Sequence, residues 1–142
     1  MNLEYIEELI NKENIELINA YLKNSQGLYA NYNNIKFIIY DKTKIRNSYE
    51  KKQILIEELS HYYYNATYNF NSDLQFINKQ EYKAKMESYN LLIPFDKLQL
   101  LMQNNSITLY DLADYFEVTV EYMQNAIEFY TNKYENFIKN IS

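Results

Sequence analysis

The sequence predicts a single domain of mainly helical α+β fold, with a short β-hairpin and a helical tail at its C-terminal end. Apolar residues recur every three or four positions along most of the 142 residues, which is the spacing of amphipathic helices. One part of the chain departs from that spacing, where two short apolar segments flank Asn33-Asn34. A content of 47% hydrophobic and 23% charged residues is ordinary for one globular domain. We therefore expect one domain over residues 1–142, with an N-terminal helix in 1–25, the hairpin and central helices in 26–104, and the helical tail in 105–142.

The N-terminal part should combine one helix with the hairpin. Apolar spacing predicts a helix from about Leu3 to Leu22, with an interruption near residues 11–14. Gly27, the only glycine of the chain, is expected to lie in the turn that follows this helix. Leu28–Tyr32 and Ile35–Tyr40 then have the composition of two strands, and the Asn-Asn pair between them favours a tight turn.

Capping signals delimit the remaining helices. Asn47-Ser48 can cap a helix that contains the central motif, and Pro94 should end the helix before it. A polar stretch from Asn65 to Asn78 separates the first two of these helices. The predicted helices are about Tyr49–Tyr64, Lys79–Leu92, Phe95–Gln103, Leu109–Phe116 capped by Ser106 or Thr108, and Val120–Ile138 capped by Thr119.

The composition also bears on compartment. No window reaches the roughly 18 uncharged apolar residues of a membrane span, and residues 1–17 are acidic where a signal peptide would be basic and then apolar. The absence of cysteine excludes disulfides, thiolate metal sites and a cysteine nucleophile. We expect a soluble, cytoplasmic protein with no membrane partner.

The charge pattern is unfavourable for direct nucleic-acid binding. Nineteen acidic against fourteen basic residues give a net charge of -5. The main basic group, Lys42 to Arg46 followed by Lys51-Lys52, is typical of a solvated turn before a helix. The last two predicted helices have the cadence of a helix-turn-helix, but the second carries Glu121 and Glu128 and only Lys133 as a cation. Each phosphate contact needs a cation, so we expect no nucleic acid as a direct partner.

The central motif is E-E-x-x-H, formed by Glu57, Glu58 and His61. It differs at one position from H-E-x-x-H, in which two helical histidines bind zinc and the glutamate acts as general base. On a helix, Glu57 and His61 share a face, and a carboxylate can ligate zinc in place of an imidazole. The alternatives stay open: Glu57 and Glu58 can be a solvated helix face, and His61 a partly buried imidazole bonded to a tyrosine or a backbone group.

A third metal ligand would have to be a carboxylate or water, because His61 is the only histidine. Glu81, near the start of the next predicted helix, is the candidate. Glu87 lies on a different face of that helix, so Glu81 and Glu87 are not expected to point at one metal.

Three stretches together resemble the ImmA/IrrE family of metallopeptidase-like proteins: ILIEELSHYYY, then QEYKAKMESYNLLIP, then ITLYDLADYFEVTVEYMQNAIEFY. That family has H-E-x-x-H, then E-x-x-A in a helix ending L-L-x-P, then a small helical tail. The resemblance covers residues 26–134 and is strongest to the branch on phages and mobile elements of low-GC Gram-positive bacteria. It implies zincin-like peptidase helices beside a short hairpin.

The resemblance also implies roles for the motif residues. It places metal ligands at Glu57, His61 and Glu81 and the catalytic glutamate at Glu58, with Glu57 standing where the family has its first histidine. The metal would be zinc, with Mn²⁺ or Fe²⁺ favoured more than usual by the harder, more anionic ligand set. The implied function is metal-dependent endopeptidase cleavage of a helix-turn-helix repressor of a phage or mobile element. The alternative is a metal-free pseudopeptidase that binds the repressor as an anti-repressor, and the carboxylate at position 57 favours it.

Overall fold

The computed structural model describes residues 1–64 and 74–134, and for residues 74–76 the backbone alone. The elements are α1 (Leu3–Lys12), β1 (Ile15–Asn19), β2 (Gly27–Tyr32), β3 (Ile35–Tyr40), the short 3-10 helix η1 (Lys42–Lys44), α2 (Ser48–Tyr63), α3 (Leu74–Leu92), α4 (Phe95–Met102), α5 (Leu109–Phe116) and α6 (Val120–Lys133). The mainly helical α+β class predicted from the sequence is confirmed. None of the described helices is long and apolar enough to cross a membrane.

The sheet contains the predicted hairpin and one additional strand. Its strand order is β1-β3-β2, with β2 antiparallel and β1 parallel to β3. The hairpin turn is made by Asn33 and Asn34, whose φ values of 51° and 65° lie in the left-handed region. Asparagine tolerates that region better than most residues, and a turn with two such residues matches the twist of the strands it joins. The hairpin prediction is therefore confirmed.

The predicted first helix is wrong beyond Lys12. Helix α1 ends there, Asn14 adopts a left-handed φ of 58°, and Ile15–Asn19 form β1. Five residues of β1 pair with β3, so β1 gains its backbone hydrogen bonds from a segment about twenty residues away along the chain. The apolar residues of this segment satisfy helical and strand spacing equally, and the distant partner decides between them. Gly27 also begins β2 instead of lying in a turn.

The helix termini follow the capping signals closely. The Asn47 side chain caps α2, Thr108 and Asp111 form a reciprocal capping box on α5, and Thr119 caps α6. Helix α3 ends before Pro94 as expected, but it begins at Leu74, earlier than the predicted Lys79. Helix α6 ends at Lys133, earlier than expected, and the remainder of that prediction, residues 135–138, lies outside the described residues, as do residues 65–73 of the polar stretch.

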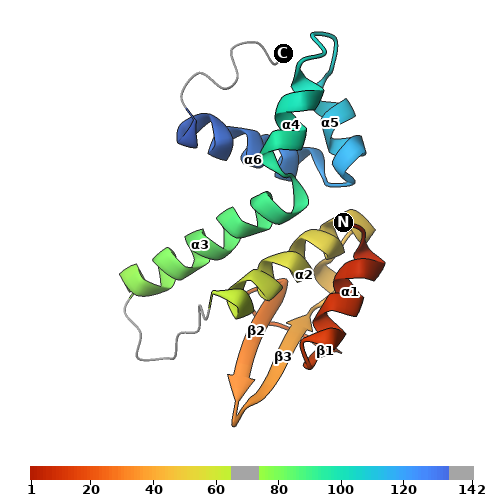
Figure 1. Ribbon diagram of the computed structural model, residues 1–142. Coiled ribbons are helices and arrows are strands. Elements are labelled where there is room, and N and C mark those ends of the chain that lie inside the picture. The colour runs from red at the N-terminus through yellow and green to blue at the C-terminus, as the bar shows by residue number, and fades with distance from the viewer. Residues whose placement is uncertain (65–73, 135–142) are drawn as a thin grey trace.

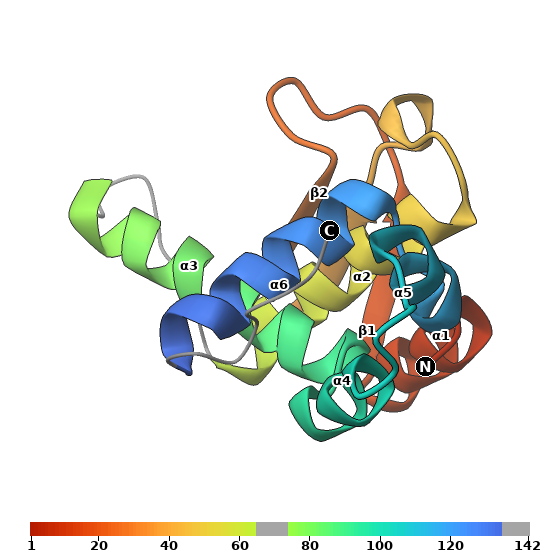
Figure 2. The ribbon, with the colours of Figure 1, turned by 90° about the horizontal axis from the view of Figure 1, so that it is seen from above.

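The elements stack in layers (Figure 1). Helices α1 and α2 cover one face of the sheet, α3 packs along α2, and α4 to α6 gather at the C-terminal end of α3. Seen from above in Figure 2, the long α3 extends away from this group while α6 lies over its other end. One core runs through all the layers, and its fully buried members include Ile6, Ile10, Ile38, Leu55, Ile56, Leu59, Ile93, Leu98, Leu112, Met123 and Tyr130.

Candidate functional site between α2 and α3

Helix α2 carries the E-E-x-x-H motif in its C-terminal half. Leu55, Ile56 and Leu59 are completely buried, so they hold this part of the helix against the core. His61 is also buried, with 4% of its surface exposed. Because four residues make about one helical turn, Glu57 and His61 leave the same side of α2, and that side faces α3.

Helix α3 meets this face with two charged side chains. The His61 Nε2 atom lies 3.3 Å from Oε2 of Glu81. The Glu57 Oε2 atom accepts a hydrogen bond of 3.1 Å from Nζ of Lys85. Two of the three predicted ligands, His61 and Glu81, are therefore brought together, whereas the third, Glu57, is paired with a cation one helical turn away.

Glu58 points toward the sheet instead of α3. A Cβ atom built on Gly27 at the start of β2 would lie 3.2 Å from Cγ of Glu58 and 2.6 Å from Cγ2 of Ile54. The only glycine of the chain is therefore needed for close approach between β2 and α2, and it provides the space that Glu58 fills. A backbone hydrogen bond from Tyr29, on the same strand, also reaches the Glu58 carboxyl.

The close grouping of carboxyl groups changes the protonation of the site. Burial is the main cause that raises the pKa of Glu58 to about 7, and the charges of Glu57 and Glu81 raise it further while His61 opposes them. Burial by itself lowers the pKa of His61, but the contact with Glu81 and the charges of Glu58, Glu81 and Glu57 outweigh it and raise that pKa. The raised pKa of His61 works against metal binding, because a histidine ligand has to be neutral.

As they stand, these side chains do not fit a catalytic metal centre. Such a centre needs three protein ligands around one point, with a fourth position for water. In the part of the chain that the structure describes, no three His, Cys, Asp or Glu side chains are grouped so that they could hold a metal ion. The ammonium group of Lys85 contacts the carboxylate that would complete the set. The ligand roles of Glu57, His61 and Glu81 and the base role of Glu58 stay predictions.

Lys85 is the residue of this site that the sequence reasoning missed. It follows Glu81 by four positions in α3, the same spacing that separates Glu57 from His61 in α2. That matched spacing on two antiparallel helices is a signal that could have identified it.

Glu87, expected on another face of α3, accepts a 3.0 Å hydrogen bond from the Tyr64 hydroxyl at the end of α2, away from Glu81.

Comparison with protein families matches residues 10–128 to the family of M78 peptidases, described as the IrrE N-terminal-like domain. The matched range contains the sheet, the E-E-x-x-H helix and most of α6. Peptidases of this family are generally zinc-dependent. Neither among curated proteins nor among solved structures does any match reach significance.

Proposed function

We propose a function from the premise that this chain belongs to the IrrE N-terminal-like family of M78 peptidases. In this proposal the chain uses its metallopeptidase-like fold to bind a helix-turn-helix repressor of a phage or mobile element. Binding, without cleavage, would relieve repression, so the chain would act as an anti-repressor. A repressor works on DNA in the cytoplasm, and the proposal therefore implies a cytoplasmic protein.

The observation that carries this proposal is the pairing of Glu57 with Lys85. Glu57 stands where the resemblance to this family puts the first metal ligand, and its carboxylate is engaged by a lysine of α3 at 3.1 Å. Because Glu57 is engaged in this way, no three donor side chains of the described residues are gathered around one point, and this favours a role in binding over a role in catalysis. Recognition of a protein is then the part of the family's activity that the geometry supports best.

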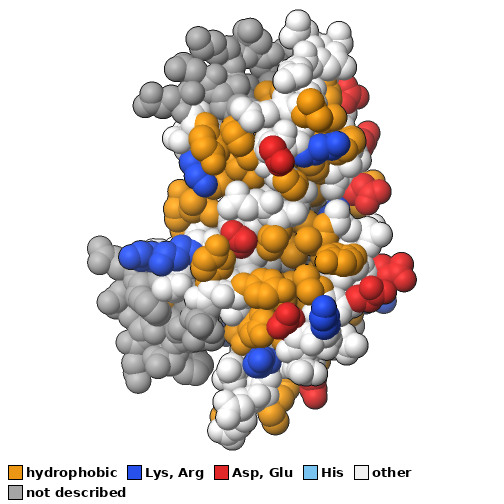
Figure 3. All heavy atoms as spheres, in the orientation of Figure 1, with side chains coloured by type: hydrophobic (Ala, Val, Ile, Leu, Met, Phe, Trp, Pro, Cys, Tyr) orange, Lys and Arg blue, Asp and Glu red, His pale blue; other side chains and the backbone are white. Residues whose placement is uncertain are grey.

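The surface near the site suits a protein partner. Strand β2 lies at an edge of the sheet, and an extended segment of a partner can add to such an edge through main-chain hydrogen bonds. Exposed tyrosines flank the facing ends of α2 and α3, namely Tyr63, Tyr64 and Tyr82. Tyrosine is enriched where proteins bind each other tightly. In Figure 3, hydrophobic side chains gather across the middle of this face, with acidic and basic groups between them.

Loss of an exposed tyrosine should weaken repressor binding. Tyr82→Ala removes a ring that is 62% exposed beside the site, and we expect the dissociation constant for the repressor to rise by about 5- to 30-fold. Calorimetric titration with a candidate helix-turn-helix repressor would measure this. Tyr110→Ala is the control, because Tyr110 is 69% exposed on α5. Equal affinity of both variants and the wild type would rule out this surface as the contact.

Metal-dependent cleavage of the same repressor is the second candidate. It is favoured by the 3.3 Å contact between His61 and Glu81 and by the half-buried Glu58, whose carboxyl interacts electrostatically with both residues of that pair. Glu57 would have to leave Lys85 before it could serve as the third ligand. Intact-mass spectrometry of chain and repressor, with added Zn²⁺ or Mn²⁺, separates the two candidates. Binding alone leaves the repressor intact, whereas cleavage yields fragments that disappear in Glu58→Gln.

A further inference from the structure

The two contacts between α2 and α3 form a ladder. Glu57 and His61 are four residues apart on α2, and their partners Lys85 and Glu81 are four residues apart on the antiparallel α3. The rungs, of 3.1 Å and 3.3 Å, therefore lie one helical turn apart and connect the same two helix faces. Each rung joins a carboxylate to a nitrogen that can carry a positive charge.

Lys85 is held in place by α6 as well as by Glu57. Its Nζ atom lies 5.6 Å from the centre of the Tyr122 ring, within the range of a cation–π contact. The Tyr122 hydroxyl donates to Ser88 Oγ at 2.8 Å, and Ser88 Oγ donates to the backbone oxygen of Lys85 at 2.6 Å. Ser88 and Tyr122 are both buried, so the backbone and the ammonium group of Lys85 are positioned by a rigid part of the molecule.

An ammonium in this place does two things that oppose metal binding. It occupies the hydrogen-bonding oxygen of Glu57, the carboxylate needed as a third ligand. It also puts a positive charge one helical turn from the pair formed by His61 and Glu81, and that charge repels a divalent cation bound there. Glu57 can pair with this ammonium because its carboxylate is negatively charged. The histidine that H-E-x-x-H has at this position would be a neutral imidazole and could not form the same ion pair.

We propose that Lys85 is a built-in counter-ion that takes the place of a metal in this site, closing α2 on α3 through Glu57 and excluding a divalent ion. The role of Lys85 follows from the charges inside the chain and does not depend on whether a repressor is the partner. A chain that binds no repressor at all could still show every result described below.

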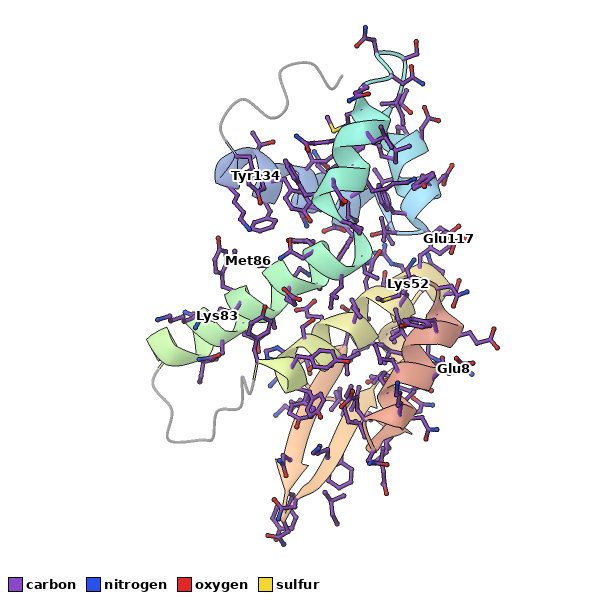
Figure 4. All side chains as sticks on the ribbon, in the orientation of Figure 1. Glu8, Lys52, Lys83, Met86, Glu117 and Tyr134 are labelled. Carbon is purple, nitrogen blue, oxygen red and sulfur yellow. The ribbon has the colours of Figure 1, made fainter. Side chains whose placement is uncertain are left out.

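Removal of the Lys85 charge should open the site to metal. In Lys85→Met, which keeps most of the aliphatic stem, we expect Zn²⁺ to bind at least about tenfold more tightly than to the wild type. The gain should disappear in the double variant Lys85→Met/Glu81→Gln. Calorimetric titration of the full chain with Zn²⁺ measures both. The control is Lys83→Met, because Figure 4 shows Lys83 on the side of α3 away from α2, and this variant should match the wild type.

A second measurement tests the pair without any metal. We expect Glu57→Gln and Lys85→Met each to lower the thermal midpoint in the presence of chelator, and the double variant to lower it no further than the more damaging single change. If Lys85→Met does not fold, Lys85→Gln replaces it in both experiments.

Three results would overturn the proposal. They are a wild-type chain that binds one Zn²⁺ and is stabilised by it, a Lys85 variant that binds Zn²⁺ no more tightly than the wild type, and additive effects of the two substitutions on the thermal midpoint.

Discussion

Gly27 shows how a single residue can be required by one close approach. Its φ is not positive, so the backbone conformation does not demand glycine. The demand comes from Ile54, whose Cγ2 methyl group would lie 2.6 Å from any Cβ atom at position 27. Ile54 is buried and branched at Cβ, so it has little freedom to move aside. The contact brings β2 near enough to α2 for the Glu58 carboxyl to lie between them.

The variant Gly27→Ala should be less stable than the wild type. Overpacking against Ile54 and Glu58 costs about 1–3 kcal/mol, which exceeds the smaller gain of about 0.4–1 kcal/mol from a stiffer unfolded chain. Chemical denaturation monitored by circular dichroism measures the difference. Asn31→Ala, at an exposed position of the same strand, is the control and should change stability little. A wild-type midpoint in Gly27→Ala would mean that β2 can move away from α2 at no cost.

At the scale of elements, α2 anchors the C-terminal helices as well as the sheet. Two neighbouring residues near its start reach the segment between α5 and α6. Lys52 Nζ donates to the backbone oxygen of Phe116 at 2.9 Å, and Gln53 Oε1 accepts from the backbone N–H of Thr119 at 2.7 Å. Burial lowers the pKa of Lys52, although the charge of Glu117, labelled beside it in Figure 4, opposes this. These contacts satisfy backbone groups at the end of α5 and the start of α6 that have no helical partner.

Substitution of Gln53 should loosen this junction. Gln53→Ala leaves the Thr119 N–H without its acceptor in a partly buried place, at a cost of about 1 kcal/mol in the free energy of unfolding. Hydrogen exchange should show faster exchange in α5 and the first turn of α6 than in the sheet. Gln99→Ala, at an exposed position of α4, is the matched control. Unchanged exchange at the start of α6 would show that the junction does not depend on this hydrogen bond.

For the whole molecule, the distribution of charge argues against nucleic acid as a partner. The net charge is -5, and the main basic group of the sequence is largely engaged within the chain. Lys44 donates to the backbone oxygen of Leu22, Arg46 pairs with Glu50 at 2.9 Å, and Lys51 pairs with Glu7 at 3.3 Å. Lys52 is buried. The negative charges of Glu50 and Glu7 partly neutralise Arg46 and Lys51 and so weaken their attraction to a phosphate.

We therefore expect no retention of the chain on duplex DNA, even at low salt. Electrophoretic mobility of a labelled duplex in about 50 mM salt tests this, because phosphate-driven binding is strongest at low ionic strength. Helix α6, the candidate recognition helix, carries the acidic residues Glu121 and Glu128, and its cation Lys133 lies in the last turn. Retention that weakens steeply as salt rises would revive the helix-turn-helix interpretation.

Features determined by near neighbours along the chain could be predicted from the sequence. The turn of the hairpin follows from Asn33-Asn34, and the start of α5 follows from Thr108 and Asp111, because the residues that form this turn and this cap lie within four positions of one another. The end of α3 follows from Pro94 in the same way. The family, too, could be recognised from motifs that are local in sequence, and the match over residues 10–128 confirms it.

Features that join distant segments were decided by the tertiary structure alone. Strand β1 exists because β3 pairs with it, and Gly27 is required because α2 packs against β2. The candidate site also combines a local feature with a tertiary one. The spacing of Glu57 and His61 can be read from the sequence, whereas the side chain that pairs with each of them cannot. The approach of α3 assigns Glu81 to His61 and Lys85 to Glu57. Helical spacing specifies which side chains share a face, but the charge that meets that face depends on which helix packs against it and in what register.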